Sequence, residues 1–83
     1  MARKRYEQAK RYKFEDAYNL AHKNSDVVII SAVTEDKYRI DKTVNEEEIK
    51  FYSSTINRWR KCEFILTKEI LSDWYVEIEG KVR

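Results

Sequence analysis

The chain of 83 residues contains no proline, one glycine, one cysteine and one histidine. A lone cysteine, Cys62, cannot form an intrachain disulfide, and Cys62 with His22 cannot supply the four ligands of a structural zinc site. One glycine is too few for a phosphate-binding glycine loop. These shortages argue against an extracellular disulfide scaffold, a structural zinc domain and a glycine-loop nucleotide enzyme.

Long apolar segments are also missing. The longest fully apolar run is the four residues 27–30, whereas a membrane-spanning helix needs about 20. No apolar segment follows the basic start of the chain, as one does in a signal peptide. We therefore expect a cytoplasmic protein with no membrane partner.

Charge is abundant and unevenly distributed. Charged residues make up 39% of the chain, and the formal net charge is +2. Residues 1–13 carry six cations and one anion, so the rest of the chain is net negative. We expect a single domain over residues 1–83, with a basic amino-terminal arm at 1–13 and a folded core at 14–83. A domain of this size buries only about 60% of its unfolded surface, which favours a homo-oligomer, a dimer or tetramer.

The apolar pattern predicts an α+β fold. Apolar residues at helical spacing predict one main helix over 14–24, with Asn24 in the left-handed conformation that ends a helix. A short second helix is expected at 68–72, with Thr67 as its cap. Apolar or alternating stretches predict strands at 27–33, 37–41, 49–56, 61–66 and 74–79. We expect the main helix to pack on a mostly antiparallel sheet of four or five strands, with the short helix before the last strand.

Catalytic and metal-binding patterns are weak in this sequence. His22 falls in the last turn of the main helix, where a protonated imidazole suits the helix dipole. The acidic run Glu46–Glu48 is typical of a solvated turn, and Cys62 alternates with Phe64 and Leu66 as a small core residue. We therefore expect a protein that is not an enzyme and that uses no cofactor and no metal.

Two short segments have the chemistry of ligand binding. The first is Arg58-Trp59-Arg60-Lys61, where a flat aromatic side chain suited to stacking on a base is flanked by cations suited to phosphate oxygens. Its structural alternative is that Trp59 anchors a loop while the cations solubilise it. The second is Asp73-Trp74, in which Trp74 is core or pocket wall and Asp73 caps a turn or accepts a hydrogen bond from a base or ribose. The candidate ligand-binding residues are therefore Arg58, Trp59, Arg60, Lys61, Asp73 and Trp74.

The order of several signals resembles the small phage Thoeris anti-defence sponge family. Members begin with a Phe-x-x-Ala helix and close with a short helix ending in Asp-Trp. The matching positions here are Phe14-x-x-Ala17, the helix end at Asn24, the Val27-Val28 strand and Thr67-x-x-Ile70-Leu71-Ser72-Asp73-Trp74. The Arg-x-x-Trp that usually follows the first strand is absent.

The resemblance implies a function without turnover. Family members are homo-oligomers that sequester cyclic ADP-ribose isomers, and related phage sponges bind the cyclic di- or trinucleotides of CBASS defence. By position, Asp73 and Trp74 match the family's Asp-Trp element. The expected partner is then a cyclic nucleotide, bound in the cytoplasm of an infected bacterial host so that anti-phage defence is evaded. Two rivals remain open, a small nucleic-acid-binding module and a phage protein inhibitor of a host enzyme.

Overall fold

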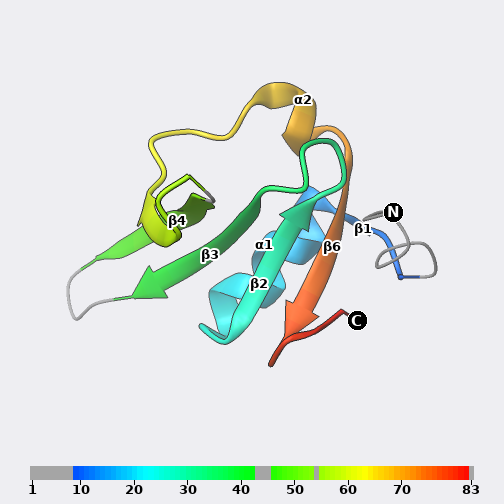
Figure 1. Cartoon of the computed structure of the whole chain (residues 1–83). Coiled ribbons are helices and arrows are strands. Elements are labelled where there is room, and N and C mark those ends of the chain that lie inside the picture. Colours follow the sequence, from blue (N-terminus) through cyan, green and yellow to red (C-terminus); the bar gives the residue numbers. More distant parts are fainter. Residues whose placement is uncertain (1–8, 43–45, 54, 83) are drawn as a thin grey trace.

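A computed structural model of the protein describes residues 9–42, 46–53 and 55–82. None of the helices in these residues is long and apolar enough to cross a membrane. Figure 1 shows the chain order of the elements. They are β1 (Tyr12–Lys13), α1 (Phe14–Lys23), β2 (Val27–Ser31), β3 (Lys37–Lys42), β4 (Glu47–Ser53), β5 (Arg58–Lys61), α2 (Thr67–Ile70), β6 (Asp73–Ile78) and β7 (Lys81–Val82).

The strands form one sheet in which every pairing between the described strands is antiparallel. Their order is β1-β6-β2-β3-β4-β5, and β7 also pairs with β6. The α+β class and the antiparallel sheet are confirmed. The expected four or five strands were too few, because the described residues form seven. Two of these, β1 and β7, are only two residues long, too short to leave an alternating pattern in the sequence.

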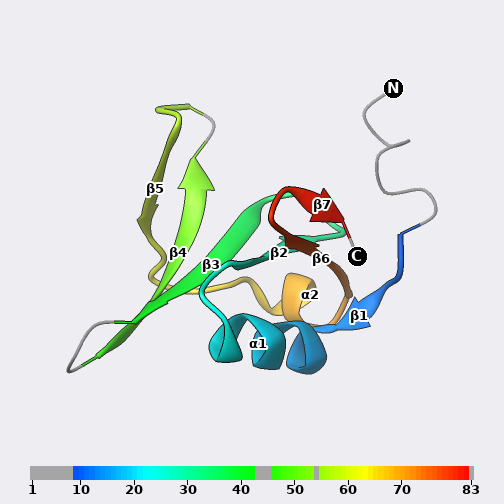
Figure 2. The same cartoon turned by 90° about the horizontal axis from the view of Figure 1, so that it is seen from below.

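Helix α1 lies against one face of the sheet, with α2 on the same side (Figure 2). Ala17 and Ala21, four residues apart, are fully buried at this contact, because only small side chains fit there. The helix spans 14–23, close to the prediction. Asn24 does not end it in the left-handed conformation: its φ is −143°, and its Oδ1 instead accepts a hydrogen bond from the Asp26 amide at 2.9 Å.

The main core fills the space between α1 and the sheet. The buried residues of the core are Ala17, Ala21, Val27, Ile29, Tyr38, Ile40, Trp74 and Val76. A second, smaller cluster on the opposite face is built on Ile30 and Tyr75. Strand β2 supplies side chains to both clusters and is therefore buried on both faces.

The expected strand at 61–66 is wrong. The strand is β5 at 58–61, while residues 62–66 run from the end of β5 to α2 across the top of Figure 1. Cys62 and Ile65 pack on the core, whereas Phe64 is 73% exposed. The two inward side chains are three residues apart, whereas a strand places every second side chain on the same face. The apolar residues here therefore belong to an irregular segment that connects β5 to α2.

Part of the predicted basic arm belongs to the sheet. Tyr12 pairs with Trp74 and Lys13 with Asp73, so the sheet begins before α1. Residues 1–8 of the arm lie outside the described residues.

Candidate ligand-binding site

A pocket of about 450 Å³ opens where β3, β4 and β5 meet the segment that leads to α2. A pocket of this size is in the range of small-molecule sites. Aromatic side chains, cations and carboxylates all contribute to its wall. The lining residues are Asp36, Tyr38, Phe51, Arg60, Lys61, Cys62, Glu63, Phe64, Leu66 and Glu69.

One wall of the pocket is a row of side chains that crosses three neighbouring strands. Tyr38 on β3 is opposite Phe51 on β4, and Phe51 is opposite Arg60 on β5. Directly paired residues present their side chains on the same face of a sheet. The row therefore places an aromatic ring between a buried phenol and a cation at the sheet edge. The Tyr38 and Phe51 ring centroids are 6.5 Å apart.

The inner end of the row is closed by a buried carboxyl. Glu69 is 2% exposed, and its Oε1 accepts hydrogen bonds from the Tyr38 hydroxyl at 3.0 Å and from the Thr34 hydroxyl at 3.2 Å. Burial, together with the charge of Glu69, raises the pKa of Tyr38 well above its usual range. Tyr38 therefore remains a hydrogen-bond donor at neutral pH, and it fixes the position of the carboxyl.

The outer end of the row is a cation. Arg60 is exposed and makes no ion pair with any residue in the described ranges. A guanidinium in this position is available for charge-assisted hydrogen bonds to an anion. The pocket thus has a cation at one end and a carboxyl at the other, with Phe51 between them.

The strand geometry of β5 distributes the four side chains of residues 58–61 over two faces of the sheet. Alternation along β5 places Arg58 and Arg60 on one face and Trp59 and Lys61 on the other. Lys61 Nζ reaches Glu48 Oε2 at 3.9 Å. The expected joint action of Trp59 with cations on both sides is therefore not available within this strand, and of the four only Arg60 and Lys61 line the pocket.

Trp59 instead packs on the opposite face of the β3–β5 region. Its ring lies edge-on to Tyr52, with the centroids 5.6 Å apart, and the Arg39 guanidinium carbon lies 4.5 Å from the ring centroid. Trp59 is half-buried by these contacts. This arrangement agrees better with the structural alternative, in which Trp59 is an anchor, than with a role for Trp59 in ligand binding.

Trp74 has no exposed surface and belongs to the core. Its Nε1 donates to the backbone carbonyl of Glu69 at 2.8 Å, and its ring packs against Phe14 and Tyr38. The stacking role expected for Trp74 is thus corrected, because no face of its ring is open to a ligand. Its hydrogen bond holds α2, and with it the Glu69 carboxyl, against the sheet.

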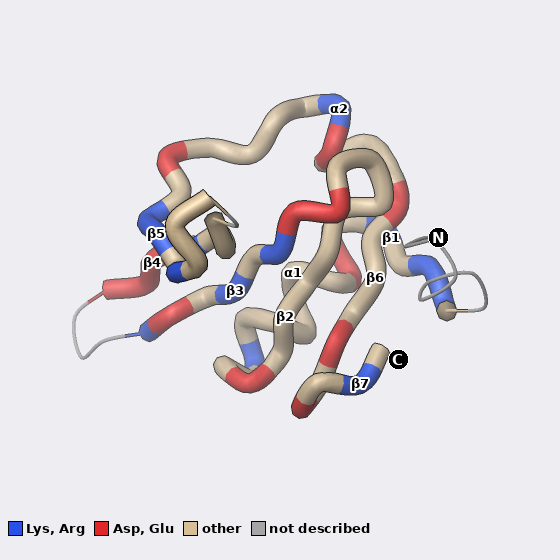
Figure 3. The backbone as a smooth tube through the Cα atoms, in the orientation of Figure 1, with Lys and Arg blue, Asp and Glu red and all other residues tan. Residues whose placement is uncertain are grey.

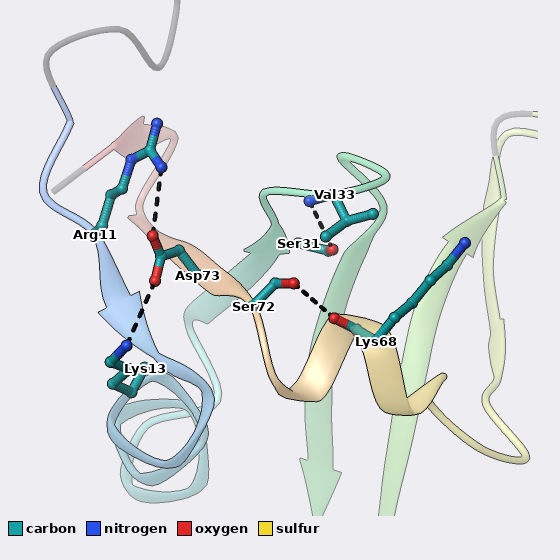
Figure 4. Close-up of polar contacts among 7 residues, drawn as sticks. All are labelled: Arg11, Lys13, Ser31, Val33, Lys68, Ser72 and Asp73. Carbon is teal, nitrogen blue, oxygen red and sulfur yellow. Dashed lines mark hydrogen bonds and ion pairs between the residues drawn. The ribbon is translucent and has the colours of Figure 1, made fainter.

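Asp73 lies outside the pocket lining and pairs with the amino-terminal segment. Its two oxygens lie 3.3 Å from Arg11 Nη1 and 4.0 Å from Lys13 Nζ (Figure 4). Because Lys13 is also paired with Asp73 in the β1–β6 ladder, these contacts fasten β1 to β6. The structure therefore places Asp73 in a structural role and separates it from Arg60.

The segment 62–66 forms the second wall of the pocket. The Cys62 amide extends the ladder by donating to the Ile49 carbonyl at 2.7 Å, and Cys62 Sγ contacts the Phe64 carbonyl oxygen at 3.1 Å. Burial raises the pKa of the Cys62 thiol. The expectation that Cys62 is a core residue agrees with its packing. Phe64 and Leu66, expected on the same inward face, are instead 73% and 44% exposed at this wall.

The histidine and the acidic run are brought together by the fold. His22 Nε2 lies 2.7 Å from Glu47 Oε2, and Glu47 and Glu48 belong to β4 rather than to a solvated turn. Figure 3 shows acidic and basic residues interspersed over β3, β4 and β5. Within residues 9–42, 46–53 and 55–82, no three His, Cys, Asp or Glu side chains are grouped to hold a metal.

Sequence reasoning missed Tyr38, Phe51, Phe64 and Glu69 as pocket residues. Tyr38 and Phe51 are typical strand residues, and only the register brings them beside Arg60. Glu69 lies in the first turn of the short helix, a position where an exposed anion is common. Its neighbours Lys68, Ile70 and Leu71 are all exposed, so the sequence around Glu69 gives no signal that this carboxyl is buried.

Comparison of the chain with protein-family models, with curated proteins and with solved structures gives no match.

Proposed function

We propose that this protein is a non-enzymatic sponge that binds and sequesters a cyclic nucleotide. The observation that supports the proposal is the row Arg60–Phe51–Tyr38 with Glu69 at its inner end. A nucleotide has the matching order of groups: an anionic phosphate, then a flat base with a polar edge. The phosphate would meet Arg60, the base would lie on Phe51, and the base edge would reach the inner end.

The chemistry is sufficient for tight binding. Stacking of a base on an aromatic ring contributes about 1 to 3 kcal/mol, and a hydrogen bond to a charged group contributes about 1.5 to 3 kcal/mol. Binding of this kind requires no general base and leaves the ligand intact. The proposed role, as the sequence resemblance implies, is to withhold a cyclic ADP-ribose isomer or a CBASS cyclic nucleotide from a bacterial effector during phage infection.

The proposal includes a homo-oligomer, a dimer or tetramer. The wall formed by 62–66 carries exposed Phe64 and Leu66, and Leu71 beyond α2 is 78% exposed. A second copy that covered these side chains would bury apolar surface and close the pocket over a ligand that is larger than one nucleotide. Light scattering at micromolar concentration should therefore give more than one chain per particle. A monomer mass at every concentration would remove this part of the proposal.

The test of binding is titration calorimetry with cyclic ADP-ribose, cyclic di-AMP and cyclic GMP-AMP, followed by chromatography of the released ligand. Arg60→Ala should weaken binding by about 10- to 150-fold, because one charge-assisted contact is lost. Arg58→Ala is the matched control, since it removes a cation from the same strand and the same face but outside the pocket lining. Equal affinity of the wild type and the Arg60 variant would refute the site, and a hydrolysed product would refute a sponge.

A nucleic-acid-binding function is the main alternative, and it would use the opposite face with Trp59 and Tyr52. The cations of that face are engaged within the chain. Arg39 Nε lies 3.0 Å from Asp41, Lys50 Nζ lies 3.5 Å from Glu48, and Lys37 Nζ lies 3.6 Å from Glu77. Paired cations release few counterions on binding to a phosphate backbone. The pocket is therefore the better supported site, and polymer affinity that falls steeply with salt would favour the alternative.

An inhibitor of a host enzyme would instead bind a protein through the exposed apolar side chains near α2.

A further inference from the structure

The inner end of the pocket holds a carboxyl with one oxygen unused. Both hydrogen bonds that the structure gives the Glu69 side chain fall on Oε1, from Tyr38 and from Thr34. Oε2 accepts no hydrogen bond from any residue of the described ranges and is not itself fully buried, so it reaches the space of the pocket that Glu69 lines. A ligand in the pocket can therefore donate a hydrogen bond to an oxygen that belongs to a residue only 2% exposed.

The position of this oxygen is fixed before a ligand arrives. The backbone carbonyl of Glu69 receives the Trp74 indole N–H, so α2 is attached to the core. The carboxyl is held separately by the Tyr38 and Thr34 hydroxyls, which come from β3 and from the loop before it. Three contacts from three parts of the chain thus orient Glu69, and a preorganised acceptor loses little entropy when it binds.

The surroundings make this end of the pocket selective for donors. An ionised carboxylate only accepts hydrogen bonds, and the Tyr38 and Thr34 protons are already committed to Glu69. Asp36, on the same wall, adds a second carboxylate. A carbonyl or phosphate oxygen would therefore meet acceptors and like charge here, whereas an amino group would find a partner. The anion of a ligand is left to Arg60, two strands away across the sheet.

We propose that Glu69 accepts a hydrogen bond from the exocyclic amino group of a base, such as the 6-amino group of adenine, through Oε2. This inference rests on the proposed function, and it narrows the ligand to nucleotides whose base carries an exocyclic amino group. Inosine is the closest counterpart that should be rejected, because it carries a carbonyl where adenine carries the 6-amino group. The loss of one hydrogen bond to a charged group corresponds to about 10- to 150-fold in affinity.

The test is an NMR titration of the full chain with 3′,5′-cyclic AMP and 3′,5′-cyclic IMP. These probes have the same ribose and phosphate and differ in the purine, at C6 and at N1. Wild type should bind cyclic AMP at least 10-fold more tightly. Glu69→Gln should reverse the preference, since the amide oxygen can still accept from Tyr38 and Thr34 while the amide nitrogen faces the pocket and donates to the inosine carbonyl. Arg60→Ala should weaken both probes by the same factor.

The outcomes distinguish the role of Glu69 in base recognition from nucleotide binding in the pocket. Equal binding of both probes to wild type would overturn the inference that Glu69 recognises an amino group and leave the nucleotide pocket in place. Binding of neither probe up to millimolar concentration would overturn both. The wild-type comparison requires no substitution, so the inference can be refuted even if Glu69→Gln does not fold. Thermal unfolding of each variant shows whether its affinity can be interpreted.

Discussion

The indole of Trp74 donates to the main-chain carbonyl of Glu69 over 2.8 Å, so a fully buried tryptophan in β6 holds the short helix that carries a pocket residue. This contact gives one residue two effects that can be measured separately. Loss of the ring affects the core, and loss of the N–H affects the attachment of α2.

Trp74→Ala should lower the free energy of unfolding by about 3 to 5 kcal/mol, as expected for truncation of a buried aromatic side chain. Trp74→Phe keeps a ring but removes the donor, and it should cost less. Trp59→Phe is the matched control, because Trp59 is only half-buried and its contact with Arg39 is of the kind worth about 0.5 to 1 kcal/mol. Urea unfolding followed by circular dichroism measures all three. A Trp59 variant as unstable as Trp74→Ala would contradict the assignment of the core.

Tyr38→Phe should reduce stability by about 1 to 3 kcal/mol at neutral pH, because the buried Glu69 carboxyl loses a donor. Tyr52→Phe, which removes an exposed hydroxyl that is 3.4 Å from Asn57, should change stability by less than about 0.5 kcal/mol. Thermal unfolding at pH 7 compares the two. Equal effects would mean that the contact between Tyr38 and Glu69 contributes nothing to the fold.

The same tyrosine should control the alkaline limit of stability. Its pKa in the folded chain is raised, chiefly by burial, above the unfolded value of about 10. The folded state then binds the phenolic proton more tightly, so this contribution is complete below about pH 10 and is lost as the pH rises toward the folded pKa. The stability difference between wild type and Tyr38→Phe should therefore shrink above pH 10. A difference that stays constant from pH 8 to 11 would show that the pKa of Tyr38 is not raised.

Asp73→Asn should destabilise the protein only slightly, by less than about 1 kcal/mol, since its contacts with Arg11 and Lys13 are largely exposed. The local effect should be clearer, because faster hydrogen exchange at Tyr12 would report release of β1. Nucleotide affinity should not change, since Asp73 does not line the pocket. A large loss of affinity in this variant would return Asp73 to the binding site.

Cys62 offers a chemical probe of the pocket. Its raised pKa, caused chiefly by burial, lowers the fraction of thiolate, so reaction with a disulfide reagent at pH 8 should be slower than for a free cysteine and should accelerate as the pH rises. A ligand in the pocket should slow the reaction further, because Cys62 lines it. Absorbance of the released thiolate gives both rates. Equal rates with and without a bound nucleotide would place the ligand elsewhere.

The fold was largely predictable where one residue pattern had one structural meaning. In β6, Trp74 and Val76 face the helix while Glu77 lies on the other face, and the alternation predicted that strand within one residue. Strand β5 gave no such signal, because three of its four residues are cationic. It is held by its backbone ladder to β4 and by the contact between Trp59 and Tyr52, which sequence spacing does not reveal.

The candidate site was predictable only in part, because it is assembled across strands. Arg60 was identified by its charge, but its neighbour Phe51 comes from the pairing register of β4 and β5. Glu69 requires the packing of α2 on Tyr38, a contact over 31 residues of chain. Conversely, Trp74 has the chemistry of a stacking residue, and only its complete burial removes it from the pocket.

The position of β5 restricts how copies of this chain can associate. In the described part of the chain β5 is the last strand of the sheet, so its outer backbone groups have no strand partner. An open edge normally invites a second strand. Here, continuation of the sheet through two β5 strands would place Arg58, Arg60 and Lys61 of one copy against the same three cations of the other. Like-charge repulsion therefore works against a continuous intermolecular sheet, so any assembly of this protein should form through side-chain packing near Phe64 and Leu71.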